Sequence, residues 1–157
     1  MRAKLLTVTA ILLTFVGSLS AADKSPSQIL GGKPAATSAG SGRYYDGHGA
    51  YAGRSNQSGS SVRLYDGQGR STGRVEESKG STRIYDRSGS YAGRSATSGG
   101  ATSFYDSKGS YSGRSSTSGN STRFYDGQGA YAGRAETSGG TTRYYDAQGR
   151  YAGSKAK

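Results

Sequence analysis

Large apolar side chains follow two separate patterns along this chain. The first is a continuous apolar run from Leu5 to Val16, with a short basic start at residues 1–4 and small residues at 20–22. The second begins at Arg43, where single aromatic or aliphatic residues stand among polar ones and return every 20 residues. The first pattern is typical of a cleaved leader, and the second is typical of a repeat architecture.

The apolar run predicts a secretory signal peptide over residues 1–22, with cleavage after Ala22. A transmembrane helix needs roughly 20 apolar residues, and this run is shorter. We therefore expect a secreted or periplasmic bacterial protein with no transmembrane segment after processing, which argues against a partner among intracellular nucleic acids. Residues 23–42 hold both prolines among Ser, Ala and Gly, a composition that predicts a flexible linker.

Residues 43–157 contain six copies of one unit, at 43–62, 63–82, 83–102, 103–122, 123–142 and 143–157. Every copy has a Tyr-Asp pair, a Gly three residues after the Asp, and a second Gly four residues later. Aromatic and β-branched residues flank the segment from Asp to the first Gly, which predicts a β-hairpin. The residue after Asp is Gly in three copies but Arg87, Ser107 or Ala147 in the others. The turn is therefore predicted as type I, closed by a left-handed Gly in a bulge.

This turn places the Tyr before Asp opposite the second Tyr of the same unit, as in Tyr125 and Tyr131. The opposite face carries a large apolar residue in every copy, at Tyr44, Leu64, Ile84, Phe104, Phe124 and Tyr144. A single hairpin with bulk on both faces is at best marginally stable in water, so the units must pack on one another. The predicted fold is all-β: tandem β-hairpins stacked as a solenoid or as an extended single sheet.

The core of the repeat, seen as YDGQGAYAG at 125–133 and YDAQGRYAG at 145–153, resembles the YD repeats of the rearrangement-hot-spot family of bacterial exported proteins. That resemblance covers all six units and implies hairpins that wind into a long sheet. The period of 20 and the order of Tyr and Gly are more loosely similar to the repeats of choline-binding and glucan-binding surface proteins, which implies carbohydrate binding.

Composition limits the chemistry that this chain can perform. It has no Cys and a single His, His48, in the turn of the first unit, which excludes disulfides and a His/Cys metal cluster. No group able to act as nucleophile or base accompanies His48, so we expect no enzymatic activity and no cofactor. The repeated Asp is expected to cap its turn, because one carboxylate per 20 residues is too few for a calcium site.

The formal net charge is +11, and its basic residues recur in step with the repeat. One Arg series opens the units, at 43, 63, 83, 123 and 143, and a second follows the second Gly. Ladders of Arg interleaved with Tyr suit an anionic polymer, although they also suit a solvated face that keeps the array soluble. The candidate binding residues are Tyr45, Tyr51, Tyr85, Tyr91, Tyr105, Tyr111, Tyr125, Tyr131, Arg54, Arg74, Arg94, Arg114 and Arg134.

Two functions remain open at this point. The first is a non-enzymatic protein that acts in binding or structure at the cell envelope, with anionic polysaccharide or another envelope polymer as its partner. The second is a self-assembling extracellular fibre or matrix subunit, in which the terminal hairpins at Tyr44-Tyr45 and Tyr144-Tyr145 would pair between molecules.

Overall fold

A computed structural model describes residues 40–157 of the chain. The described part is all-β, as predicted, and consists of twelve antiparallel strands. The strands are β1 (Gly42–Asp46), β2 (Tyr51–Ser58), β3 (Ser61–Asp66), β4 (Ser71–Ser78), β5 (Ser81–Asp86), β6 (Tyr91–Ser98), β7 (Ala101–Asp106), β8 (Tyr111–Ser118), β9 (Ser121–Asp126), β10 (Tyr131–Ser138), β11 (Thr141–Asp146) and β12 (Tyr151–Ala156). The predicted signal peptide, and the predicted linker up to residue 39, lie outside the described residues.

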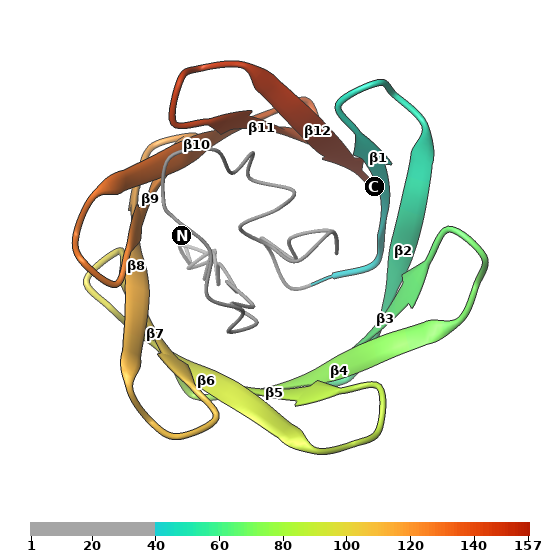
Figure 1. Cartoon of the computed structure of the whole chain (residues 1–157). Helices are drawn as coiled ribbons and strands as arrows, with labels where there is room; N and C mark the ends of the chain where they lie inside the picture. The colour runs from blue at the N-terminus through green and yellow to red at the C-terminus, as the bar shows by residue number, and fades with distance from the viewer. Residues whose placement is uncertain (1–39) are drawn as a thin grey trace, which may run out of the picture.

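Each strand pairs with its neighbours in sequence, and β1 pairs with β12 to close a barrel (Figure 1). The tandem hairpins are confirmed, but the expected solenoid or extended single sheet is wrong, because the array curves back onto its own first strand. The turns inside the repeats, each from an Asp to a Gly, extend outward at one end of the barrel. The turns that connect one repeat to the next lie at the other end (Figure 1).

The turn inside each repeat has the predicted chemistry. In the first hairpin the carbonyl oxygen of Asp46 accepts the Gly49 N–H at 3.0 Å. The Asp46 carboxylate accepts the N–H groups of His48 and Ala50, each at 2.9 Å. Gly49 has φ of 82°, the left-handed conformation that favours glycine. The Asp and Gly of the remaining repeats make the same contacts, so this turn is confirmed in all six.

Each hairpin also contains a second bulge, which was not predicted from the sequence. Tyr44 pairs with Gly53 and Tyr45 with Tyr51, which leaves Ala52 without a partner residue. Gly53 has φ of 150°, and a Cβ added there would overlap the backbone oxygen of Tyr65 on the next hairpin. Glycine is therefore required at this position by conformation and by close backbone approach.

The repeated bulge accounts for closure of the barrel. A β-bulge bends its strand and increases the local twist, and here the same bulge occurs once in every hairpin. Because the bend occurs at the same position in every hairpin, the bends add and curve the sheet in one direction, as closure of a barrel requires. We call the pairing between the second strand of one hairpin and the first strand of the next a joint.

The closing joint has the same register as the internal joints. In the β2–β3 joint the pairs are Gly53 with Asp66 and Arg54 with Tyr65. In the β12–β1 joint the corresponding pairs are Gly153 with Asp46 and Ser154 with Tyr45. The sixth joint therefore continues the repeat without a slip, and the first and last strands of the described chain have no open edge toward one another.

The inner face of the barrel wall carries the buried residues. The large apolar residue of each repeat points inward, and Tyr44 and Phe104 are each only 1% exposed. Val62, Leu64, Val75 and Ile84 form one apolar cluster. Small hydroxyl side chains fill the neighbouring inward positions, among them Ser55, Ser95, Ser115, Thr82 and Thr102. The predicted apolar face is thus the inside of the barrel, and the paired tyrosines belong to its outside.

Candidate functional site

Paired tyrosines form the most regular feature of the outer surface. Five of the hairpins carry a tyrosine pair with ring centroids 6.1–6.2 Å apart and planes at 71–77°, an edge-to-face geometry. The pairs are Tyr45–Tyr51, Tyr85–Tyr91, Tyr105–Tyr111, Tyr125–Tyr131 and Tyr145–Tyr151. In the remaining hairpin Tyr65 pairs with Ser71. The predicted cross-strand tyrosine pairing is therefore confirmed.

The second tyrosine of each pair remains open to solvent. Tyr51, Tyr91, Tyr111, Tyr131 and Tyr151 are 40–46% exposed, although they are large and partly apolar. Tyrosine combines an apolar ring with a polar hydroxyl, which suits contact with a partner that is itself amphipathic. A row of such rings around the barrel offers flat stacking surfaces at regular intervals.

Five of the six joints place an arginine over the first tyrosine of the next hairpin. The Arg54 guanidinium lies 4.8 Å from the centroid of the Tyr65 ring, and Arg94 lies 4.0 Å from that of Tyr105. Arg74, Arg114 and Arg134 lie over Tyr85, Tyr125 and Tyr145 at 4.2, 4.8 and 4.5 Å. These cation–π contacts span successive hairpins and hold each guanidinium against the wall. At the closing joint Ser154 replaces the arginine.

Arginines also face one another within hairpins. The register pairs Arg43 with Arg54 across β1 and β2, and Arg83 with Arg94 across β5 and β6. Arg63–Arg74 and Arg123–Arg134 are equivalent pairs, whereas Ser103 faces Arg114 and Arg143 faces Ser154. The two predicted Arg ladders are therefore adjacent. Like charges directly opposite each other on one face of a sheet are destabilising unless something neutralises them.

Two of these arginine pairs have a carboxylate bound to them. Glu76 accepts a hydrogen bond from Arg74 Nε at 3.0 Å, and Glu136 accepts one from Arg134 Nε at 2.8 Å. The Glu136 carboxylate raises the pKa of Arg134. Arg74 and Arg134 are partly buried, while Arg54 and Arg94 are exposed. Glu76 and Glu136 were not among the residues predicted from the sequence, although both stand two residues after an Arg of the second series.

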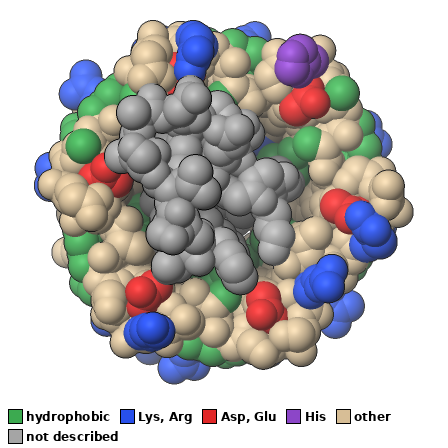
Figure 2. Space-filling view, in the orientation of Figure 1, with side chains coloured by type: hydrophobic (Ala, Val, Ile, Leu, Met, Phe, Trp, Pro, Cys, Tyr) green, Lys and Arg blue, Asp and Glu red, His purple; other side chains and the backbone are tan. Residues whose placement is uncertain are grey.

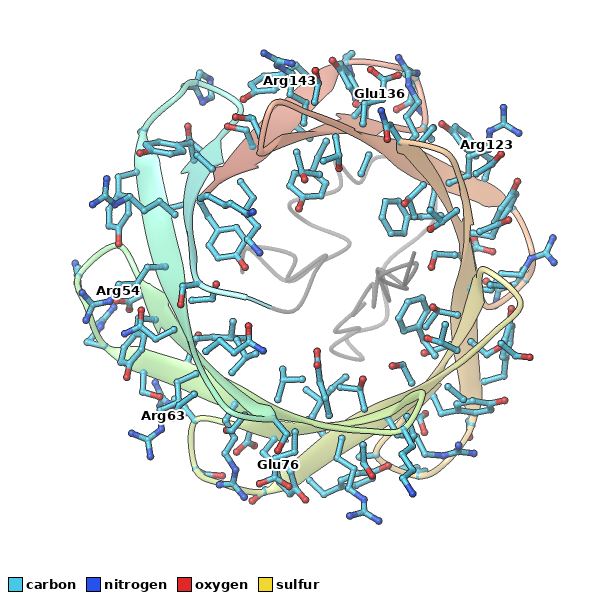
Figure 3. The ribbon with its side chains drawn as sticks, turned by 180° about the vertical axis from the view of Figure 1, so that it is seen from behind. Arg54, Arg63, Glu76, Arg123, Glu136 and Arg143 are labelled. Carbon is cyan, nitrogen blue, oxygen red and sulfur yellow. The ribbon has the colours of Figure 1, made fainter. Side chains whose placement is uncertain are left out.

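We call the outward-facing paired tyrosines and arginines the outer belt. All the predicted binding residues lie in it, and it also includes arginines of the first series that were not among them. The labelled arginines and glutamates point away from the barrel wall in Figure 3. Basic side chains are spread around the circumference in Figure 2, and the acidic groups visible there lie closer to the barrel opening.

The turn aspartates are already engaged by their own hairpins. The backbone N–H and the side chain of Arg70 hold the pKa of Asp66 below its ordinary value, with Arg70 Nε 2.8 Å from the carboxylate. His48 is an exposed turn residue whose N–H donates to Asp46. Between residues 40 and 157, no three His, Cys, Asp or Glu side chains are arranged to hold a metal ion. The same part of the chain has no helix suited to crossing a membrane.

No family model, curated protein or solved structure matches this chain. The resemblance of its Tyr-Asp motif to YD repeats therefore stays a prediction. What the outer belt does is inferred from its own chemistry.

Proposed function

We propose that this protein is an exported, non-enzymatic binding protein that holds acidic polysaccharide at the bacterial cell envelope. The observation that carries the proposal is the outer belt, in which guanidinium groups and exposed tyrosine rings recur side by side around the barrel. Guanidinium groups donate charge-assisted hydrogen bonds to carboxylate or sulfate, and aromatic rings stack on the apolar faces of sugars. An acidic sugar offers both partners at once.

The repetition of the belt supports a polymeric ligand. Equivalent weak contacts along one surface raise the overall affinity only when a single ligand reaches several of them. The apolar run at Leu5–Val16 supports export, which would bring the protein to envelope and extracellular polymers.

The fibre alternative has less support from the fold. It needs the terminal hairpins to pair between molecules, but β1 pairs with β12 of the same chain through Arg43–Ala156, Tyr44–Lys155, Tyr45–Ser154 and Asp46–Gly153. The backbone groups that would join a second molecule are therefore already used within the barrel.

The test is binding of the purified protein to heparin, polygalacturonate and neutral dextran, measured by calorimetry at several salt concentrations. We expect binding to both acidic polymers that weakens steadily as salt rises, and no binding to dextran, because screening reduces contacts between exposed charges. Affinity that does not change with salt, or equal affinity for dextran, would contradict the proposal. Sequencing the N-terminus of the exported protein tests cleavage after Ala22 separately.

A further inference from the structure

The six hairpins present different versions of the outer belt. A complete version has two facing tyrosines and two facing arginines on one hairpin. The β1–β2 hairpin meets this description with Tyr45, Tyr51, Arg43 and Arg54, and the β5–β6 hairpin meets it with Tyr85, Tyr91, Arg83 and Arg94. The β9–β10 hairpin has the same four residues, but we do not count it as complete because Arg134 forms an ion pair with Glu136.

The remaining hairpins each lack part of the set. In β3–β4, Ser71 replaces the second tyrosine and Glu76 binds Arg74. In β7–β8, Ser103 stands opposite Arg114, and in β11–β12, Ser154 stands opposite Arg143. The two complete hairpins are thus separated by β3–β4, whose arginine pair carries a carboxylate of its own.

The arginine pairs in the complete hairpins are not neutralised by an acidic partner. Among the described residues, the ion pairs join Arg70 to Asp66, Arg74 to Glu76, Arg134 to Glu136 and Arg150 to Asp146. Glu76 lies across a joint from Arg83, but its carboxylate is bound by Arg74. Arg54 and Arg94 contact the faces of Tyr65 and Tyr105, so their N–H groups stay available at the rim of each guanidinium.

We infer that the β1–β2 and β5–β6 hairpins are the two anion-selective subsites of the barrel, each taking one acidic sugar residue. The carboxylate or sulfate accepts hydrogen bonds from the N–H groups of Arg54 or Arg94, and Arg43 or Arg83 on the paired strand adds a second positive charge beside it. The sugar ring lies against the adjacent exposed tyrosine, Tyr51 or Tyr91, which are 46% and 40% exposed. The inference rests on the proposed function and adds to it which hairpins carry the ligand.

In this arrangement Glu76 and Glu136 prevent the arginine that each binds from binding an anionic ligand. Glu136 supplies to Arg134 the carboxylate that a ligand supplies to Arg54 or Arg94. Removing its charge therefore opens a third complete set, made of Tyr125, Tyr131, Arg123 and Arg134.

The experiment compares two double variants of equal charge. Arg54→Gln with Arg94→Gln removes one arginine from each proposed subsite. Arg114→Gln with Arg134→Gln removes two arginines of the same series from outside the subsites. Each double variant removes two charges and two cation–π contacts. Binding of a size-defined heparin oligosaccharide is measured by calorimetry at constant salt, after circular dichroism has shown that both variants keep the β signal of the parent.

We expect the first double variant to lose about tenfold or more in affinity and the second less than about threefold, since only the first removes charge-assisted hydrogen bonds to the ligand. Equal losses in the two variants would overturn the subsite assignment while leaving the proposed function intact. Failure of the parent protein to bind any acidic glycan would overturn both.

A gain-of-binding variant supplies an independent measurement. Glu136→Gln should bind the oligosaccharide more tightly than Glu77→Gln, which makes the same charge change on the inner side of the wall. Equal affinity of these two variants would contradict the inference. Titration with single-stranded DNA of matched charge separates sugar recognition from general attraction of polyanions: DNA binding as tight as that of heparin would overturn the assignment to acidic sugar.

Discussion

At the scale of single residues, Glu77 departs from the pattern of its repeat. In three joints the inward position holds threonines whose hydroxyls pair, as in Thr97–Thr102 at 2.9 Å and Thr117–Thr122 at 3.0 Å. In the β4–β5 joint the corresponding pair is Glu77 with Thr82. Glu77 Oε1 is buried without a hydrogen-bond partner, and burial raises the pKa of this carboxyl.

Replacing Glu77→Thr should therefore stabilise the barrel by about 1 kcal/mol at neutral pH, because it removes an unsatisfied buried acceptor and restores the threonine pair. A raised pKa in the folded state means that the Glu77 carboxyl favours folding most at pH below its unfolded pKa. That contribution is lost as pH rises through the folded pKa. The advantage of the variant should accordingly grow as pH rises from about 4, the range of an ordinary carboxyl.

Urea unfolding of both proteins between acidic and neutral pH measures this difference. Glu76→Thr is the matched control, since Glu76 forms a partly exposed ion pair on the outer face and its loss should cost less than about 1 kcal/mol. A Glu77→Thr protein that is less stable than the parent at neutral pH would show that the carboxyl has a favourable partner.

At the scale of the hairpin, the two glycines that occur in every repeat have different structural roles. Gly109 closes a turn with φ of 83° and has open space where a Cβ would be. Gly113 has φ of 146°, and a Cβ there would lie 2.5 Å from the backbone oxygen of Tyr125 in the next hairpin. The second glycine therefore serves the joint as well as its own strand.

Gly113→Ala should destabilise the barrel by about 2–4 kcal/mol, because both the backbone conformation and the β8–β9 contact must change. Gly127→Ala is the control. Its Cβ would lie 3.5 Å from the nearest atom, and Ala147 occupies the same place in the last repeat, so we expect a change within about 0.5 kcal/mol. Thermal and denaturant unfolding of both variants compare the two positions, and similar losses would mean that the joint tolerates a side chain.

The structure within each hairpin could be predicted from the sequence because its interactions are local. Asp46 and Gly49 are three residues apart, and the side-chain options for that turn are few, so turn type and the Tyr45–Tyr51 pairing could both be predicted. The contact between Arg54 and Tyr65 crosses a joint, and its register depends on the bulge at Ala52–Gly53. The constant spacing of Arg and Tyr was visible, but it indicates a contact only after that register is known.

At the scale of the whole molecule, closure depends on the sum of the bends. No single residue encodes it, since a repeat that bends slightly less would give an open sheet or a coil of the same hairpins. This is why an open array was predicted from a sequence that forms a barrel. The residues of the outer belt could be predicted from the repeat. That Glu76 and Glu136 neutralise Arg74 and Arg134 could be recognised only from the structure.

Removing β12 tests the importance of closure. A chain ending at Asp146 would leave β1 and β11 with unpaired backbone groups, and exposed strand edges promote association between molecules. We expect this truncated protein to form oligomers or aggregates at concentrations where the full chain does not. Light scattering coupled to size-exclusion chromatography measures the difference, with removal of Lys157 alone as the control. A monodisperse monomer without β12 would show that closure does not protect the edges.

All six joints have the same register, so the backbone pairing alone does not distinguish the first repeat of the ring from any other. Adding or removing one 20-residue copy would change the circumference of the barrel, whereas the bend at every bulge would stay the same. A protein with five or seven copies would have to strain all its joints or remain open. The number of copies and the bend of each hairpin are therefore set together, and six copies with this bend close the ring.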